Sequence, residues 1–394
     1  MAHLIPPPLE MMRRLIECPS VSSTDPHRDQ GNLEVIHRLA EWLADLGFMI
    51  EVIPVADNKA NLRAVLGDPD GNDGLVLAGH TDTVPFDEGR WSVDPFAGVV
   101  KGDALFGLGS ADMKSFLALA VEAARRLGTT RLQRPLTILA TADEESSMSG
   151  ARMLLEERRH LGRFCVIGEP TGLKPIRMHK GVMMEAIDVE GQSGHSSDPT
   201  LGANAIDGLH AILGELVEWR RELQRLHHDP DFQVPYPTLN LGSIHGGDNP
   251  NRICGRCALQ IDLRPLPGME LSALRHELRE RIARAMAGHP RLRWSHRPLF
   301  DGLPPFATPA DSILVQACEA ITATQAGAVA FGTEAPLLSA LGLQTVVLGP
   351  GHIAQAHQPD EFLPLAHIEP CLSVLGELID RFCIRPEAMV EHPS

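Results

Sequence analysis

The sequence has no long hydrophobic run and no N-terminal segment that resembles a secretion signal. No apolar stretch in the 394 residues approaches the roughly 18 residues that a membrane-spanning helix needs. Residues 1–8 contain three consecutive prolines instead of a basic segment followed by an apolar core. We therefore expect a cytoplasmic protein with no membrane partner.

Cysteine is scarce, and positive charge is in deficit. The 7 cysteines are odd in number and scattered, which suits reduced thiols better than a disulfide framework. Cys254 and Cys257 form a CxxC pair, but no second pair or nearby histidine cluster completes a zinc knuckle, so we expect a structural role. The formal net charge of -16 argues against nucleic acid as a partner, because phosphates would repel the chain.

Helix and strand patterns alternate through the first 180 residues, as is typical of an α/β domain. The predicted helices cover 33–46, 113–127 and 151–161, and the predicted strands cover 62–66, 75–78, 136–140 and 164–167. The alternation resumes near the C-terminus, with a helix predicted at 312–323 and a strand at 344–348.

A second pattern interrupts this alternation. From about residue 181 the predicted order is strand, helix, two strands, helix and strand, at 183–189, 203–226, 238–244, 253–264, 271–287 and 292–296. This βαββαβ order is the ferredoxin-like pattern. We therefore predict an α/β catalytic domain in two parts, residues 1–180 and 298–394, interrupted by an inserted α+β domain at 181–297.

Acidic and histidine side chains gather where the predicted strands end. His80 and Asp82 end one strand, and a period of two places both on one face, where the imidazole is suited to bind a metal and the carboxylate to orient it. Asp143, Glu144 and Glu145 follow another strand. Three acids in a partly buried place favour a bound cation, although capping of the next helix is an alternative.

Three further candidates occupy similar positions, and each has a simpler explanation by itself. Glu169 follows a strand, where surface acids are common. Asp112 precedes a predicted helix, which is a usual N-cap position, and it replaces the third glycine of a GxGxxG-like sequence, which argues against a nucleotide site. His357 lies in a loop, where histidines are usually solvent-facing or structural. Together, two histidines and three acids supply ligands for two zinc ions and leave Glu144 as a free base.

These residues lie in motifs that resemble those of the dinuclear zinc amidohydrolases, a family that includes acetylornithine deacetylase, succinyl-diaminopimelate desuccinylase and related carboxypeptidases. The resemblance covers essentially the whole chain. The shared motifs are AGHTDTVP (78–85), GLGSADMK (107–114), ATADEE (140–145), IGEPT (167–171), GQSGHSSDP (191–199), DLRPLPG (262–268), GTEAP (332–336) and AHQPDE (356–361). Three other segments, GRWSVDPF, HGGDNPNRIC and LGPG, are most similar to the acetylornithine deacetylase branch.

The resemblance implies a zinc-peptidase-like catalytic domain that holds two zinc ions per subunit, with cobalt able to substitute. The implied ligands are His80 and Glu169 for one ion, Glu145 and His357 for the other, and Asp112 as a bridge between them. Asp82 is implied to orient His80, and Glu144 is implied to act first as general base and then as general acid.

The resemblance also implies that the inserted domain serves as a lid and forms a homodimer. His195 would reach the oxyanion from a partner subunit, although a turn histidine in a Gly/Ser loop is the simpler explanation without the family. The residues that resemble substrate contacts are Lys180, Asn251, Arg264, Gly332, Thr333 and Glu334. Arg264 suits a carboxylate but could equally form a structural ion pair.

The implied reaction is the hydrolysis of N2-acetyl-L-ornithine to L-ornithine and acetate, in arginine biosynthesis. Glu334 is a candidate for favouring a cationic side chain such as that of ornithine. A desuccinylase, an acetylcitrulline or other N-acyl-amino-acid deacetylase, and an exopeptidase remain alternatives. A metal-binding relative without catalysis is disfavoured, because neither Glu144 nor any ligand is missing.

Overall fold

The computed structural model describes residues 5–71 and 73–386, and the chain divides into two compact units. The first unit runs to residue 177 and includes 308–327 and the chain from 333, and the second comprises 178–307 and 328–332. Residues 1–4, part of the segment in which we expected no secretion signal, lie outside the described residues. Among the helices that are described, none is both long and apolar enough to cross a membrane.

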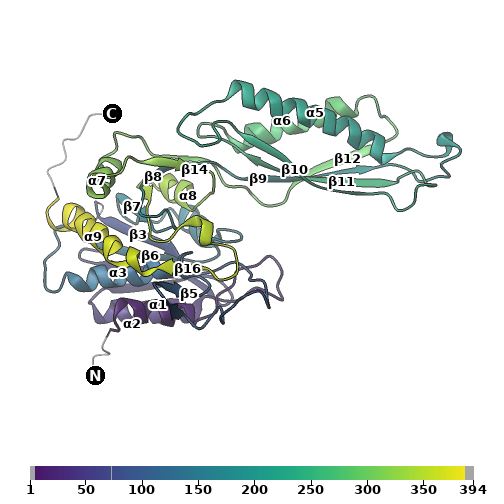
Figure 1. Ribbon diagram of the computed structural model, residues 1–394. Helices are drawn as coiled ribbons and strands as arrows, with labels where there is room; N and C mark the ends of the chain where they lie inside the picture. The colour runs from purple at the N-terminus through teal and green to yellow at the C-terminus, as the bar shows by residue number, and fades with distance from the viewer. Residues whose placement is uncertain (1–4, 72, 387–394) are drawn as a thin grey trace. The chain divides into compact units, whose positions relative to one another are not determined.

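A mixed sheet forms the centre of the first unit (Figure 1). Within the described residues it has nine strands, in the order β1 (Met49–Ala56), β2 (Lys59–Leu66), β6 (Leu136–Thr141), β3 (Leu75–His80), β7 (Phe164–Ile167), β15 (Gln344–Val347), β8 (Ile176–His179) and β13 (Phe306–Ala307), with β14 (Gly327–Val329) paired to β8. β3 runs parallel to β6 and β7, and β15 runs parallel to β7. The carboxyl ends of these four strands therefore lie at the same end of the sheet, where α/β proteins bind their ligands.

Helices lie against this sheet, and most of them share one apolar core. They are α1 (Pro8–Ile16), α2 (Leu33–Asp45), α3 (Lys114–Arg126), α4 (Ser149–Glu156), α7 (Ile313–Thr322), α8 (Ala335–Ala340), α9 (Ile368–Ile379) and the π-helix η4 (Asp380–Ile384). α3 is buried from its first residue to Ala124, because α1 and α9 contact it in addition to β3. Phe116 of α3, Leu77 of β3 and Ile138 of β6 belong to the same core.

Short elements complete the first unit. A three-stranded sheet has the order β16 (Phe362–Pro364), β5 (Ala104–Phe106) and β4 (Val99–Lys101). Two single turns of 3-10 helix, η2 (Ile353–Gln355) and η3 (Leu365–His367), lie on either side of β16 in the sequence. This small sheet therefore joins residues near 105 to residues near 363, although more than 250 positions separate them.

The second unit is a four-stranded antiparallel sheet with two long helices (Figure 1). The strand order is β10 (Thr238–Gly246), β11 (Arg256–Arg264), β9 (Met183–Glu190) and β12 (Arg293–Pro298), and the helices are α5 (Ala205–Leu226) and α6 (Leu271–Met286), with a 3-10 turn η1 (Pro199–Leu201). Its own core includes Trp219, Leu259 and Leu278. Cys254 and Cys257 are buried free thiols in that core. The predicted fold class, an α/β unit with a separate α+β unit, is confirmed.

Two element boundaries differ from the sequence prediction for identifiable reasons. The helix predicted at 151–161 ends at Glu156, because Arg158 adopts a left-handed φ of 51° that cannot continue a helix. The strand predicted at 253–264 begins only at Arg256. Its first residues instead bond to loops, since the Ile253 N–H donates to the Gly194 carbonyl.

Candidate metal centre

Parallel strand pairing brings the predicted site residues to one end of the main sheet. β3 ends at His80, which is in register with Thr141, the last residue of β6. Ala78 of β3 is likewise in register with Ile167, the last residue of β7. The acids at 143–145 and at 169 follow directly, so short connections place them beside His80. His357 reaches the same place from the loop that follows β15.

Asp112 lies between the two histidines. Its Oδ1 is 3.1 Å from Nε2 of His80, and its Oδ2 is 3.4 Å from Nε2 of His357. Nε2 of His357 is also 3.1 Å from Oε1 of Glu145, and Nε2 of His80 is 3.8 Å from Oε1 of Glu169. The structure therefore brings together all five residues that the sequence predicted as ligands. The peptide bond between Asp112 and Met113 is cis.

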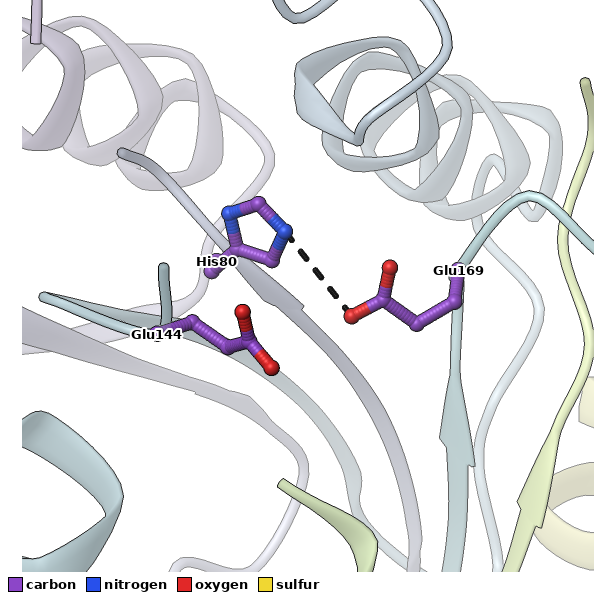
Figure 2. A group of neighbouring side chains, drawn as sticks. All are labelled: His80, Glu144 and Glu169. Carbon is purple, nitrogen blue, oxygen red and sulfur yellow. Dashed lines mark ion pairs between the residues drawn. The ribbon is translucent and has the colours of Figure 1, made fainter. Parts of the chain in front are cut away.

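Glu144 belongs to the same cluster. Figure 2 shows its carboxylate directed toward His80 and Glu169, and one ligand atom from each of these three residues lies within 4.8 Å of the others. A second group with the same spacing consists of His80, Asp112 and Glu145. Each group combines an imidazole nitrogen with carboxylate oxygens, which is a donor set that zinc accepts.

Burial makes this concentration of charge costly. His80, Asp112 and Glu169 are at most 5% exposed, and Glu144 is 9% exposed. Burial raises the pKa of Glu144 and of Glu169 well above the usual value, and neighbouring carboxylates add to both shifts.

For the two imidazoles, burial lowers the pKa and the neighbouring carboxylates raise it. Burial lowers the pKa of His80, but Asp112 and Glu169 outweigh burial, so the net shift is well upward. Hydrogen bonds to Asp112 and Glu145 raise the pKa of His357 to about 10. The carboxylates of the cluster thus favour positive charge on the imidazoles. Divalent cations would balance the charge of these carboxylates, and the residues present fit a metal centre.

Asp82 contacts the cluster differently from our expectation. Nδ1 of His80 lies 2.9 Å from the backbone oxygen of Asp82, whereas the nearest Asp82 carboxylate oxygen is 3.8 Å away, beyond hydrogen-bond distance. The carboxylate instead accepts the backbone N–H groups of Glu144 and Glu145, at 3.2 and 3.0 Å. Asp82 therefore orients His80 through its main chain and holds the turn that carries two other site residues through its side chain.

Neither alternative explanation by helix capping holds in the structure. α4 begins at Ser149 with Met148 as its N-cap residue, and no side chain caps it. Glu144 and Glu145 are therefore free to face the cluster. α3 begins with Met113 in the N-cap position and also lacks a side-chain cap, so Asp112 does not cap it.

Sequence reasoning assigned no individual role to two acids that border the site. Asp143 has a left-handed φ of 60°, and its Oδ1 accepts hydrogen bonds from Lys59 and Ser22. Glu361 accepts three backbone N–H groups from the turn that carries Asp112. Burial raises the pKa of Glu361 to about 8, and these N–H groups act in the opposite direction. Glu361 ends one of the shared motifs, and Asp143 directly precedes Glu144, which is the signal that the sequence offered.

Five of the other predicted residues belong to the second unit, and four of them, His195, Asn251, Lys180 and Arg264, bond to neighbouring residues or lie in loops that do so. His195 is exposed, its Nδ1 lies 2.7 Å from Oγ of Ser197, and the neighbouring Ser196 N–H donates to the carbonyl of Asn251. Lys180 donates to the Tyr236 carbonyl at 2.6 Å, and Nε of Arg264 bonds to Asp262 at 3.0 Å. Arg264 thus forms the structural ion pair that the sequence left open as an alternative.

The GTEAP motif crosses the division between the units. Gly332 belongs to the second unit, and Thr333 and Glu334 belong to the first. Thr333 is fully buried, and its Oγ1 accepts the N–H of Ala335. Glu334 is 1% exposed, and its Oε2 accepts a 2.8 Å hydrogen bond from the Thr141 hydroxyl. Its Oε1 has no hydrogen-bond partner among the described residues.

Comparison with known proteins gives consistent similarities in sequence and fold. Residues 76–381 match the model of Peptidase family M20/M25/M40. A protein named acetylornithine deacetylase from Proteus mirabilis (strain HI4320) is 48% identical over 386 residues, which cover 98% of this chain and 99% of that protein. Another of the same name from Yersinia pestis is 46% identical over 388 residues, covering 96% and 98%.

Solved structures share the fold at much lower sequence identity. An M20 family metallo-carboxypeptidase from Sulfolobus solfataricus has a TM-score of 0.75 at 17% identity and covers 96% of this chain and 99% of its own. A tripeptidase from Staphylococcus aureus has a TM-score of 0.74 at 19% identity, covering 94% and 96%. These structural similarities establish the architecture alone.

Proposed function

Since the chain belongs to Peptidase family M20/M25/M40, we propose that it hydrolyses N2-acetyl-L-ornithine to L-ornithine and acetate, in the cytoplasm and within arginine biosynthesis. By its family and its nearly full-length similarity to proteins named acetylornithine deacetylase, it is a metal-dependent amidohydrolase. One observation carries the proposal. His80, Asp112, Glu145, Glu169 and His357 converge around a buried Glu144.

We propose two zinc ions as the cofactor, replaceable by cobalt. His80 and Glu169 would hold one ion, and Glu145 and His357 the other. The contacts of Asp112 with both imidazoles support its role as the shared ligand. Bound zinc supplies Lewis acidity, which lowers the pKa of water and polarises the acyl carbonyl.

The protein itself supplies proton transfer and orientation. Glu144 accepts a proton from water as the water oxygen adds to the acyl carbon, and it returns that proton to the amide nitrogen as the carbon–nitrogen bond breaks. The second proton of the water leaves the carboxylic acid that forms, so the products are acetate and the protonated amine. The Asp82 carbonyl holds Nδ1 of His80, so Nε2 faces the cluster, and the Asp82 carboxylate holds the turn of Glu144 in place.

The second unit is proposed to act as a lid and to form a homodimer in which His195 donates to the developing oxyanion of a partner subunit. The exposure of His195 and the contact of its loop with Asn251 support this role. The proposed substrate contacts are Lys180, Asn251, Arg264, Gly332, Thr333 and Glu334. Lys180 and Arg264 already have partners in the fold, so they would exchange these partners for substrate groups.

The decisive experiment compares four substrates with purified, zinc-loaded protein: N2-acetylornithine, N-acetylcitrulline, N-succinyl-diaminopimelate and a dipeptide. We expect the highest kcat/KM on N2-acetylornithine. Glu144→Ala should lower kcat by roughly 10²- to 10⁴-fold while zinc stays bound, because the variant lacks the proton acceptor but keeps all five ligands. Similar rates on all four compounds would overturn the substrate, and an active Glu144→Ala variant would overturn the mechanism.

A further inference from the structure

The motif AHQPDE ends in a carboxylate that the proposed reaction does not use. Glu361 is 1% exposed and immediately precedes β16. Its Oε1 accepts the backbone N–H of Ala111 at 2.8 Å and that of Asp112 at 3.0 Å, and its Oε2 accepts the N–H of Gly109 at 3.2 Å. Both carboxylate oxygens of Glu361 therefore accept hydrogen bonds from a single backbone turn, residues 109–112.

That turn is irregular and depends on these hydrogen bonds. Gly109 has a φ of +83°, which lies in the left-handed region that favours glycine, so the turn is not part of a helix or strand. The backbone N–H of Gly107 also donates to the main-chain carbonyl of Glu361, at 3.1 Å. Without the Glu361 carboxylate, three buried N–H groups would lose their acceptor, which would free the backbone that carries Asp112.

The segment 357–361, which ends in Glu361, carries another proposed ligand, His357. His357 lies four residues before Glu361, and it and Asp360 both have a left-handed φ of 59°. Asp360 accepts the backbone N–H of Ser92 at 2.8 Å, and Phe362 pairs with Phe106 in the small sheet. The 357–361 segment is therefore held at several points, and Glu361 joins it to the Asp112 turn.

We propose that Glu361 is a positioning residue that sets the spacing of Asp112 relative to His357 and thereby the affinity of the metal ion held by His357 and Glu145. The inference rests on the proposed metal centre. The ion held by His80 and Glu169 depends less on Glu361, because His80 ends β3 and Glu169 follows β7, and the register of these two strands is set by main-chain pairing. The effect of Glu361 is therefore asymmetric between the two ions.

The test is metal binding, measured on the full-length protein by competition with a chromophoric zinc chelator. Wild type should bind two ions. Glu361→Gln places an amide NH₂ where an acceptor is needed, so we expect one ion to bind as in wild type and the other about 10- to 100-fold more weakly. The visible absorption of the cobalt-loaded protein should change in the component that belongs to the weaker ion.

Two further variants keep the test decisive. Glu319→Gln is the matched control, because Glu319 also accepts a backbone N–H, from Ala326, but lies in α7, which contributes no proposed ligand. It should bind both ions as wild type does. Glu361→Asp keeps the charge but shortens the side chain, and it decides the question if Glu361→Gln does not fold. It too should weaken one ion selectively.

The outcomes separate the two proposals. If wild type binds two ions and both Glu361 variants bind them with unchanged affinity and an unchanged cobalt spectrum, the inference is wrong and the metal centre stands. An equal weakening of both ions would also contradict the asymmetric role. If wild type binds fewer than two ions, the proposed centre fails and the inference fails with it.

Discussion

Among single residues, Glu334 is a buried acid with only one of its two carboxylate oxygens hydrogen-bonded to a described residue. Its Oε2 accepts the Thr141 hydroxyl, but Oε1 has no partner among the described residues. Burial raises its pKa to about 7, and the Thr141 hydrogen bond opposes the shift. An acid with an unsatisfied oxygen is suited to receive a cationic group of the substrate.

Glu334→Gln tests whether this carboxylate selects a cationic side chain. The amide keeps the size of the side chain and removes its charge, so we expect kcat/KM for N2-acetylornithine to fall roughly 10- to 100-fold. The value for an N-acetylated neutral amino acid should change much less. Steady-state kinetics on both substrates measures the ratio. An unchanged preference for acetylornithine would exclude Glu334 as the selecting group.

Among elements, the turn after β6 determines which acids face the cluster. Asp143 adopts a left-handed φ of 60°, and its carboxylate is directed to Lys59 and Ser22, while Glu144 and Glu145 face the histidines. Lys59 also bonds to Asp29, and both members of the Lys59–Asp143 pair are about nine-tenths buried. The pair therefore joins the turn to β2 and to the loop before α2.

Lys59→Met tests the contribution of this turn. The substitution leaves the buried Asp143 carboxylate without its cation, so we expect a loss of roughly 3 kcal/mol in the free energy of unfolding and a lower kcat from misplaced Glu144. Urea denaturation and steady-state kinetics measure the two effects. Lys101→Met is the control, because Lys101 is exposed on β4. Equal behaviour of the two variants would show that the pair does not support the site.

At the scale of the whole molecule, the chain consists of two units with separate cores. Glu144 and the five proposed ligands belong to the first unit, and His195 belongs to the second. If His195 acts on a partner subunit, two inactive variants should restore each other in a mixed dimer. One mixed site would then combine an intact Glu144 with an intact His195.

Complementation between Glu144→Ala and His195→Ala measures this sharing of the site. Random pairing makes about half of the dimers mixed, each with one intact site, so we expect about a quarter of the wild-type activity after co-refolding of equal amounts. Each variant alone should stay inactive or nearly so. Light scattering checks that the particle is a dimer. No recovery in a demonstrated mixed dimer would show that His195 does not act across the interface.

The sequence by itself determined the fold class and the identity of the clustered side chains. The apolar runs of β3, β6 and β7 are each followed by acids or a histidine, and parallel strands bring such ends together. It could not exclude helix capping by Asp112, Glu144 or Glu145, because a capping acid and a ligating acid occupy the same place in a pattern.

Only the tertiary structure decided what each acid contacts. The hydrogen bonds of Glu361 span about 250 positions, and those of Asp143 to Ser22 span 121, so no local periodicity records them. The close contact of His80 with the carbonyl of Asp82, instead of its carboxylate, depends on the path of the chain after β3. Periodicity specifies the face on which a side chain lies, whereas its partner depends on which distant segment packs against that face.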